Sequence, residues 1–206
     1  EKFIILHVRE SNFHKDQNIP NGYLRNAKIK SYIPSIKYFI DKGYKVVRLG
    51  DEGMERIEDL DYLGNNFIDY AHLDIKKKKK VHELFFIQNC EFFFGTPSGV
   101  AETSRLFSKR LIVSNIFPNW SWSMNNRTDS GIIKKTKFSS NILSPFEQID
   151  LHLDIILNQG WEGFKDKKFE LIDNSENEIL KLAKSSLSKT PDLSDLQIRY
   201  NKYRIK

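Results

Sequence analysis

The chain has 206 residues, of which 39% are hydrophobic and 29% charged, and its formal net charge at pH 7 is +6. This length allows one domain with a sizeable core, and no apolar run approaches the roughly 20 residues that cross a bilayer. Cys90 is the only cysteine, which excludes an internal disulfide and a cysteine-rich zinc site. Because no signal peptide is visible either, we expect a cytoplasmic location.

Strand and helix patterns alternate through the first 115 residues. Continuous apolar runs predict buried strands, and apolar residues at helical spacing predict helices. In chain order we expect a strand at 3–8, a helix at 31–42, strands at 44–50 and 66–70, a helix at 81–89, a strand at 91–94, a helix at 99–107 and a strand at 110–114. This order predicts an α/β fold, with a Rossmann-like, mostly parallel sheet and helices on both of its faces.

The second half of the chain is less regular. We expect long loops at 117–144 with a short strand near 131–133, a helix at 145–158, a helix that ends at 187 and a last amphipathic helix after 191. Ser175 and Glu178 form a capping box that opens the helix ending at 187. We therefore assign residues 1–190 to one Rossmann-like domain and 191–206 to a C-terminal helix that packs on it or on a missing N-terminal domain.

Polar residues end the first predicted strand. His7 and Arg9 point to the same side, because side chains alternate along a strand. The guanidinium of Arg9 can bind two phosphate oxygens at once. Equally, Arg9 can pair with Glu10 or another acid, and His7 can be a histidine of the core. The spacing alone leaves both interpretations open.

The segment Thr96-Pro97-Ser98-Gly99-Val100 joins the fourth strand to a helix. Its hydroxyl groups and the amides of the first helical turn together suit a diphosphate. The alternative is a helix cap, in which Thr96 or Ser98 accepts hydrogen bonds from those amides. The segment matches neither the Walker pattern nor GxGxxG.

Other polar residues follow strands of the same sheet. They are Arg25 and Asn26 after the first strand, Arg48 and Asp51 at the end of the second, and Asp69 at the end of the third. The carboxyl ends of parallel strands meet at one edge, outside which open α/β sheets bind their ligands. This convergence predicts a site for a phosphate-bearing ligand.

Sequence patterns for metal and nucleophile chemistry are weak. The acidic pair Asp59 and Asp61 lies in a loop and does not follow an apolar strand. His72, Asp74 and His82 are too scattered for a zinc site. Neither GxSxG nor HExxH occurs. We therefore expect no metal, no cofactor and no covalent intermediate.

Much of the excess positive charge lies in the run from Lys76 to Lys80 and in the tail with Lys202, Arg204 and Lys206. Such a run is usually a solvated face. Its alternatives are peripheral contact with the inner face of the cell membrane and steering of an anionic substrate. Nucleic acid is not expected, because aromatic residues do not alternate with these lysines.

A family resemblance rests on the segments HVRE, RNAKIKSYIPSIKYFIDKGYKVVRLGD, IDYAH and CEFFFGTPSGVAETSRLF. In them the chain resembles a family of bacterial surface-polysaccharide glycosyltransferases and is more distantly similar to the fucosyltransferases that use GDP-fucose. The match is good over about residues 3–115 and fades through 187. It implies the donor-binding, C-terminal half of a GT-B enzyme, whose acceptor side and catalytic base belong to an N-terminal domain absent from this sequence.

The resemblance also implies individual roles. His7 contacts the nucleotide base, and Arg9 contacts the diphosphate, which Thr96, Ser98 and Gly99 also hold. Glu83 falls where the relatives have an aspartate that reads the guanine edge. Glu10 stands in place of their second arginine.

These interpretations predict a metal-independent glycosyltransferase that passes a sugar from a nucleotide sugar to a cell-surface glycan or lipid-linked acceptor. We expect Arg9 and Arg48 to be catalytic, because cations stabilise the departing diphosphate. The residues expected to bind substrate are His7, Glu10, Arg25, Asn26, Asp51, Asp69, Glu83, Thr96, Pro97, Ser98, Gly99 and Val100. The alternatives are a non-catalytic module for a nucleotide or sugar phosphate and a basic scaffold at a membrane or nucleic acid.

Overall fold

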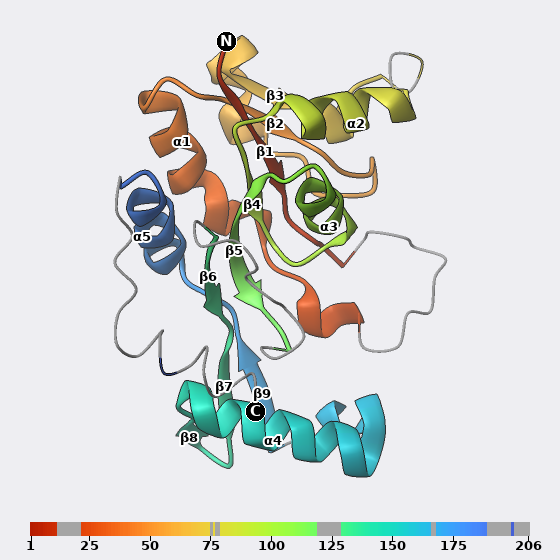
Figure 1. The fold of residues 1–206 in the computed structure, drawn as a ribbon, viewed down its shortest axis with the longest axis vertical. Helices are drawn as coiled ribbons and strands as arrows, with labels where there is room; N and C mark the ends of the chain where they lie inside the picture. The colour runs from red at the N-terminus through yellow and green to blue at the C-terminus, as the bar shows by residue number, and fades with distance from the viewer. Residues whose placement is uncertain are drawn as a thin grey trace.

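A parallel sheet organises most of the chain. The computed structural model describes residues 1–11, 22–74, 76, 79–118, 129–165, 168–188 and 199. The strands of the large sheet are β1 (Phe3–His7), β2 (Lys45–Arg48), β3 (Phe67–Asp69), β4 (Phe92–Gly95), β5 (Arg110–Ile116) and β6 (Ser130–Ile133). They lie in the order β3-β2-β1-β4-β5-β6, and all neighbouring pairs are parallel (Figure 1). This is the Rossmann strand order, which confirms the predicted fold class.

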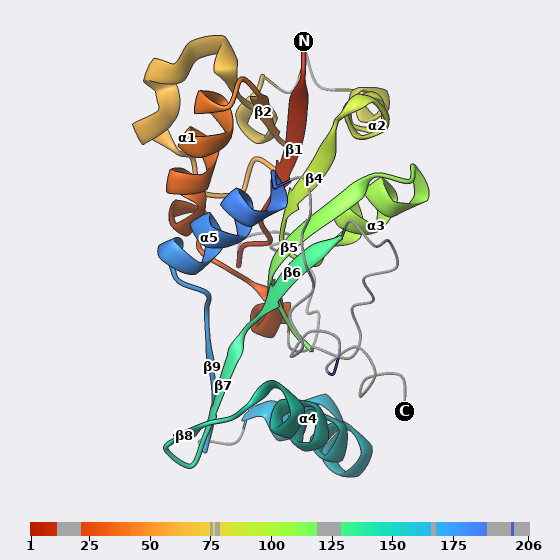
Figure 2. The same ribbon diagram turned by 60° about the vertical axis from the view of Figure 1, so that its left-hand side comes forward.

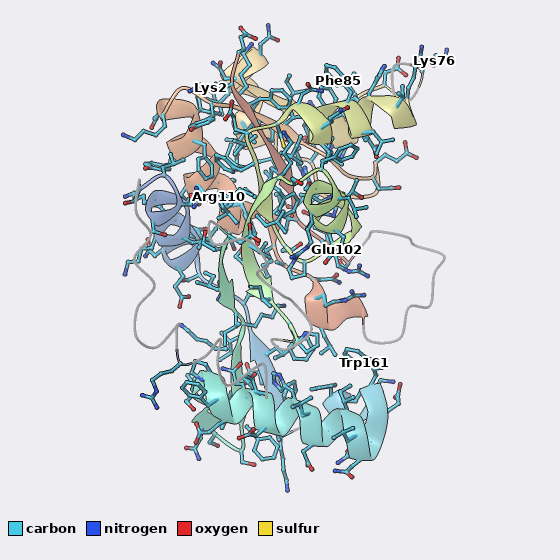
Figure 3. All side chains as sticks on the ribbon, viewed as in Figure 1. Lys2, Lys76, Phe85, Glu102, Arg110 and Trp161 are labelled. Carbon is cyan, nitrogen blue, oxygen red and sulfur yellow. The ribbon has the colours of Figure 1, made fainter. Side chains whose placement is uncertain are left out.

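Helices cover both faces of this sheet, as Figures 1 and 2 show. On one face lie α1 (Ile33–Asp41) and α5 (Glu176–Ser186), and on the other lie α2 (Lys80–Asn89) and α3 (Gly99–Leu106). The alternation of side chains along each strand supplies both cores. Phe92 and Phe94 face α1 and α5, whereas Phe93 faces α2 and α3. Side chains thus fill both layers (Figure 3).

Short 3₁₀ helices occupy several connections: η1 (Gly22–Arg25), η2 (Ile29–Tyr32), η3 (Glu58–Asn66) and η4 (Tyr70–His72). η2 leads directly into α1, where Pro34 lies in the first turn and lacks the amide that the helix does not need there. The helix predicted at 31–42 is therefore confirmed, but its first residues wind as 3₁₀.

A second, smaller sheet lies at the end of the molecule away from the N-terminus (Figure 1). Its strands β7 (Lys135–Phe138), β8 (Asn141–Ile142) and β9 (Phe169–Ile172) are antiparallel. α4 (Pro145–Gln159) and η5 (Gly160–Lys165) complete this part of the fold. Phe164 and Phe169 pack with Phe117, which follows β5, in a third apolar cluster. Lys134 alone separates β6 from β7, so nearly continuous chain links the two sheets.

Buried polar groups hold the end of β5 against the segment between β9 and α5. Asn115 and Asn174 each donate a backbone amide to the other's side-chain oxygen, at 2.6 and 2.7 Å. The Asn115 side chain also donates to the Tyr32 hydroxyl (3.1 Å). These bonds connect β5, η2 and the approach to α5.

The second half of the chain departs most from expectation. Residues 130–142 form β6, β7 and β8, so the prediction of long loops there was wrong, although the short strand near 131–133 is confirmed. Residues 119–128 lie outside the described part, as does the helix expected after 191. β9 was not predicted. α4 and α5 are confirmed, and α5 begins with the capping box of Ser175 and Glu178.

Candidate functional site

The carboxyl ends of β1 and β4 meet where the order of the sheet reverses. The Arg9 amide donates to Thr96 Oγ1 (2.8 Å), and the Thr96 amide donates to the His7 carbonyl (3.0 Å). Thr96 is fully buried. By accepting this bond, the Thr96 hydroxyl holds the backbone of Arg9 in place. Rossmann-type sheets bind their ligands outside this topological switch point, at the carboxyl ends of β1 and β4.

Gly95 allows this close approach of the two strands. An added Cβ at Gly95 would stand 1.9 Å from the His7 carbonyl oxygen, and the residue has a φ of +152°. Both facts demand glycine. The FFFG ending of β4 therefore has a steric cause, which the sequence pattern alone did not show.

Helix α3 begins at the same switch point, just after β4 ends. Ser98 Oγ accepts a hydrogen bond from the Ala101 amide (3.2 Å), so Ser98 is the N-cap, the alternative function considered for it. The space beside Gly99 is open, since no atom lies within 4 Å of an added Cβ. Pro97 is buried and Val100 packs partly into the core beneath. These two side chains support the loop, and the substrate contacts expected of them stay predictions.

The guanidinium groups of Arg9 and Arg25 lie close enough near this switch point to affect one another. Burial and the positive charge of Arg25 both lower the pKa of Arg9, with burial the larger cause. Arg9 Nε is buried and has no hydrogen-bond partner in the described structure. Among the described residues neither arginine forms an ion pair. Two adjacent cations without a carboxylate favour an anion as their partner.

His7 does not join this group. Its side chain is buried, and Nδ1 donates to the Leu49 carbonyl (3.0 Å). Burial is the largest cause that lowers its pKa to about 4, and the cations of Arg48 and Arg9 lower it further. His7 is therefore a neutral core histidine at pH 7, and the expected contact with a nucleotide base is wrong because the ring is not accessible.

Arg48 has a structural role, which corrects the expectation that it is catalytic. Its side chain is fully buried, with Nη1 3.0 Å from Asp69 Oδ2 and Nη2 3.3 Å from Glu10 Oε1. Nη1 also donates to the Glu55 carbonyl (2.7 Å). The guanidinium is enclosed by these acceptors, so it is not available to a phosphate. Asp69 is engaged in turn, and its Oδ2 also contacts His72 Nδ1 (2.9 Å).

Glu10 and Asp51 differ in their access to solvent. Glu10 is buried, and this burial is the main cause that raises its pKa, against the opposing effect of Arg48. It lies on the wall of a cavity, but its carboxylate is held by Arg48 and by the Glu55 amide (2.7 Å). Asp51 is exposed and accepts from the Gly53 amide (2.9 Å). Both carboxylates therefore stabilise the local fold.

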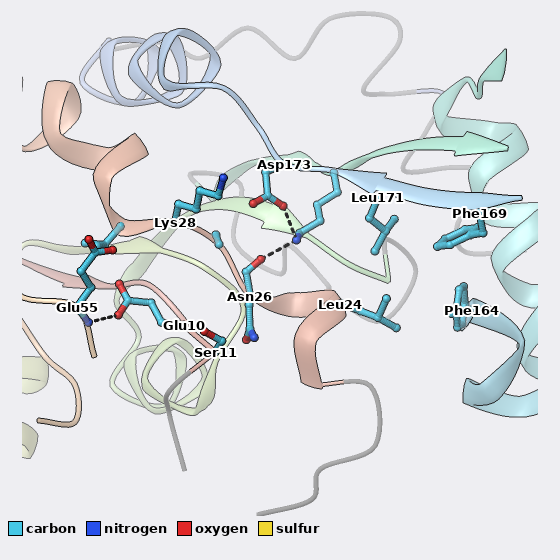
Figure 4. Close-up of a pocket in the computed structure, with 13 residues that line it drawn as sticks. Glu10, Ser11, Leu24, Asn26, Lys28, Glu55, Phe164, Phe169, Leu171 and Asp173 are labelled. Atoms are coloured by element: carbon cyan, nitrogen blue, oxygen red, sulfur yellow. Dashed lines mark hydrogen bonds and ion pairs between the residues drawn. The ribbon is translucent and has the colours of Figure 1, made fainter. Parts of the chain in front are cut away.

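A cavity of about 500 Å³ lies between the carboxyl edge of the large sheet and the small sheet (Figure 4). Its described lining residues are Glu10, Ser11, Leu24, Asn26, Ala27, Lys28, Ile29, Glu55, Lys134, Phe164, Phe169, Leu171 and Asp173. Its size is in the range of small-ligand sites. Arg9 and Arg25 are not among these lining residues, but they adjoin the lining residues Glu10, Leu24 and Asn26 in the chain.

One end of the cavity is polar and the other apolar. Lys134, which is almost fully buried, donates to the Asn26 carbonyl (2.6 Å) and to Asp173 Oδ1 (2.7 Å). Phe164 and Phe169 lie at the other end (Figure 4). Of these residues only Asn26 was predicted. Lys134 and Asp173 lie on segments where the sequence was interpreted as loop or left unassigned, and no motif identifies them.

Glu83 lies away from this constellation. It occupies the first turn of α2 and is not among the described residues that line the cavity. The role expected for Glu83 in reading a nucleotide base stays a prediction. Within the described ranges, no three His, Cys, Asp or Glu side chains cluster in a way that would hold a metal ion. No helix in those ranges is long and apolar enough to span a bilayer.

The site thus combines a Rossmann-order sheet, an arginine pair beside the start of α3 and an adjoining cavity. Comparisons of the chain with protein-family models, with curated proteins and with solved structures found no match.

Proposed function

We propose that this chain is the donor-binding domain of a glycosyltransferase that needs no metal and uses a nucleotide sugar. The observation that carries the proposal is the Arg9–Arg25 pair, which has no described carboxylate partner and lies where β1 and β4 diverge. A diphosphate would satisfy both guanidinium groups and the open start of α3 beside Gly99. The acceptor would be a cell-surface glycan or a lipid-linked sugar.

The chemistry follows from where charge develops. An acceptor hydroxyl oxygen bonds to the anomeric carbon, the bond from that carbon to the diphosphate oxygen breaks, and the acceptor proton passes to a base. Negative charge therefore grows on the departing nucleoside diphosphate. Cations that are already in place stabilise that charge without reorganising. Arg25 takes the part of the second cation, for which Arg48 was predicted, because Arg48 is enclosed by its own carboxylates.

Calorimetric titration with GDP, UDP, CDP and ADP tests the binding half of the proposal. One nucleotide is expected to bind, and Arg9→Ala or Arg25→Ala is expected to weaken it by about tenfold or more, since hydrogen bonds to charged groups contribute roughly 1.5 to 3 kcal/mol. Arg56→Ala is the matched control, because Arg56 is exposed and pairs only with Asp61 among the described residues. Equal affinity in all four proteins would remove the arginine pair from the site.

A second function, binding without catalysis, has its own support. Each carboxylate on the wall of the cavity is already engaged: Glu10 by Arg48, Glu55 by Lys30 and Asp173 by Lys134. A general base is therefore not evident among the described lining residues. If the protein binds a nucleotide sugar but neither transfers nor hydrolyses it, even when supplied with candidate acceptors, the binding module is the correct description.

A further inference from the structure

Helix α2 packs one side against the large sheet. The ring of Phe86 lies 5.2 Å from that of Tyr70, measured between centroids, and Ile87 is buried in the same core. His82 Nδ1 lies 3.2 Å from the Tyr70 hydroxyl. Residues 82, 86 and 87 thus form the inner face of the helix.

The outer face of α2 is apolar as well. Val81, Leu84 and Phe85 are 63, 48 and 58% exposed. Their spacing of three and four residues places them along one side of the helix. A helix with apolar residues all round is normally covered on every side, and a contiguous exposed apolar patch marks an interaction surface. Figure 3 shows Phe85 on α2, at the end of the molecule far from α4.

Positive charge adjoins this stripe. Lys76 and Lys79 are exposed and directly precede the helix, within the run of five lysines at 76–80. Two carboxylates are close in the chain: Asp74, which accepts from the Lys76 amide (3.0 Å), and Glu83, which is half-buried. In the sequence, the five lysines of the run outnumber these two acids, so the segment beside the apolar stripe carries a net positive charge.

Helix α4 provides the contrast. It carries an exposed stripe formed by Leu153 and Leu157, which are 36 and 80% exposed. The charged residues that adjoin this stripe on α4 are acidic, namely Asp150 and Asp154. An acidic surround repels an anionic surface, whereas the lysines before α2 attract one. Charge therefore distinguishes two stripes that hydrophobicity alone does not.

We infer that the outer face of α2 docks on an anionic lipid surface, with Val81, Leu84 and Phe85 in the acyl boundary and Lys76 and Lys79 at the headgroups. The combination of apolar stripe and adjoining lysines is that of an interfacial helix, and each lysine near such a surface adds binding energy. Nucleic acid phosphates would use the lysines but leave the apolar stripe exposed to water.

Vesicle flotation tests this docking surface. The protein is expected to float with vesicles of phosphatidylcholine and phosphatidylglycerol, not with phosphatidylcholine alone, and to dissociate in high salt. Lys76→Ser with Lys79→Ser should weaken binding roughly fivefold per lysine. Leu84→Ser with Phe85→Ser should weaken it about tenfold or more. These sites are exposed, so circular dichroism and calorimetric nucleotide binding should stay as in the unmodified protein.

Two matched variants make the result specific. Leu153→Ser with Leu157→Ser removes the apolar stripe of α4, and Lys165→Ser with Lys181→Ser removes two exposed lysines elsewhere. Both should bind vesicles normally. The inference fails if the protein binds no vesicles, or if the lysine substitutions weaken binding but Leu84→Ser with Phe85→Ser does not. It fails also if a duplex oligonucleotide binds the unmodified protein and the Leu84→Ser, Phe85→Ser variant equally well. It fails also if Leu84→Ser with Phe85→Ser turns a dimer into a monomer, because the face would then contact a second copy.

Discussion

Arg9 and Arg48 end neighbouring strands of one sheet, yet their surroundings are opposite. Arg48 is fully enclosed and has Glu10, Asp69 and the Glu55 carbonyl as acceptors. Arg9 is half-buried, has Arg25 beside it and forms no ion pair among the described residues. The Nε atoms of both arginines are buried without a hydrogen-bond partner, so the difference lies in their carboxylate partners. The charge of Arg48 is balanced by carboxylates of the protein itself, whereas that of Arg9 has no described carboxylate partner.

This difference shows how to separate structural from binding arginines at a strand end. A guanidinium whose acids come from the fold itself stabilises that fold, and its removal leaves buried carboxylates without a counter-ion. A guanidinium placed beside another cation is held against repulsion by the surrounding structure. Such a group is poised for an anion that comes from outside.

The largest expected effect is that of Arg48→Met, which keeps the volume of the side chain and removes its charge. Glu10 would stay buried and Asp69 largely enclosed without their cation, so the free energy of unfolding should fall by about 3 to 5 kcal/mol. Urea unfolding measures it. Arg56→Met, at an exposed pair, should change little. A variant of Arg48 as stable as the unmodified protein would show that the cluster is not a structural centre.

A steric prediction tests the close approach of β1 and β4, which brings the Arg9 amide to the Thr96 hydroxyl. Gly95→Ala places a Cβ on the His7 carbonyl oxygen, and the overpacking should cost about 3 kcal/mol or more. Gly99→Ala, four residues on, meets no atom within 4 Å and should be nearly neutral. Thermal unfolding of the two variants gives the comparison. If Gly95→Ala and Gly99→Ala lose the same stability, the close contact between Gly95 and His7 does not limit how near β1 and β4 approach.

Acid should weaken the fold through two buried histidines. The pKa of His7 and that of His152 both lie near 4 in the folded protein, chiefly because of burial, against 6.5 for an ordinary histidine. The unfolded chain therefore binds more protons between these values, and stability is lost as the pH falls. Each histidine should account for about 2 kcal/mol between pH 7 and pH 5. Urea unfolding at several pH values measures the slope, and His7→Asn should make it shallower. An unchanged slope would mean that His7 is protonated in the folded state.

The smallest expected effect, Arg9→Gln, sharpens the comparison most. Because Arg9 lacks a described carboxylate partner, its replacement should alter the free energy of unfolding by no more than about 0.5 kcal/mol. Inorganic pyrophosphate should raise the melting temperature of the unmodified protein and leave that of Arg9→Gln unaffected. A loss of stability as large as that of Arg48→Met would place Arg9 with the structural arginines.

The sequence predicted the large sheet well because its strands are buried on both faces. Such strands appear as continuous apolar runs between Gly43, Gly50 and similar stops, and this pattern depends little on distant contacts. The small sheet was missed because β7 and β9 carry polar residues such as Lys137 and Glu170, which form an exposed ion pair (3.2 Å). Their pairing is long-range and has no local signature.

For the candidate site, the sequence predicted only which residues lie at the carboxyl edge of the large sheet. The carboxyl ends of parallel strands lie at one edge of a sheet, so Arg9, Arg48 and Ser98 were correctly expected at one rim. Which of them is enclosed depends on partners far away in the chain, such as Asp69 for Arg48. Lys134 and Asp173 reach the cavity by way of the small sheet, whose existence had to be known first.

The passage from β6 to β7 also has a consequence for motion. Lys134 donates its amide to the Ile116 carbonyl and its ammonium to Asn26 and Asp173. One residue thus ties the rim of the large sheet to both segments that lead into the small one. We therefore expect any rocking of the small sheet against the large one to pivot near Lys134. Deuterium should accordingly replace the hydrogen of that amide only when the whole molecule opens, while the exposed hairpin at β8 exchanges early.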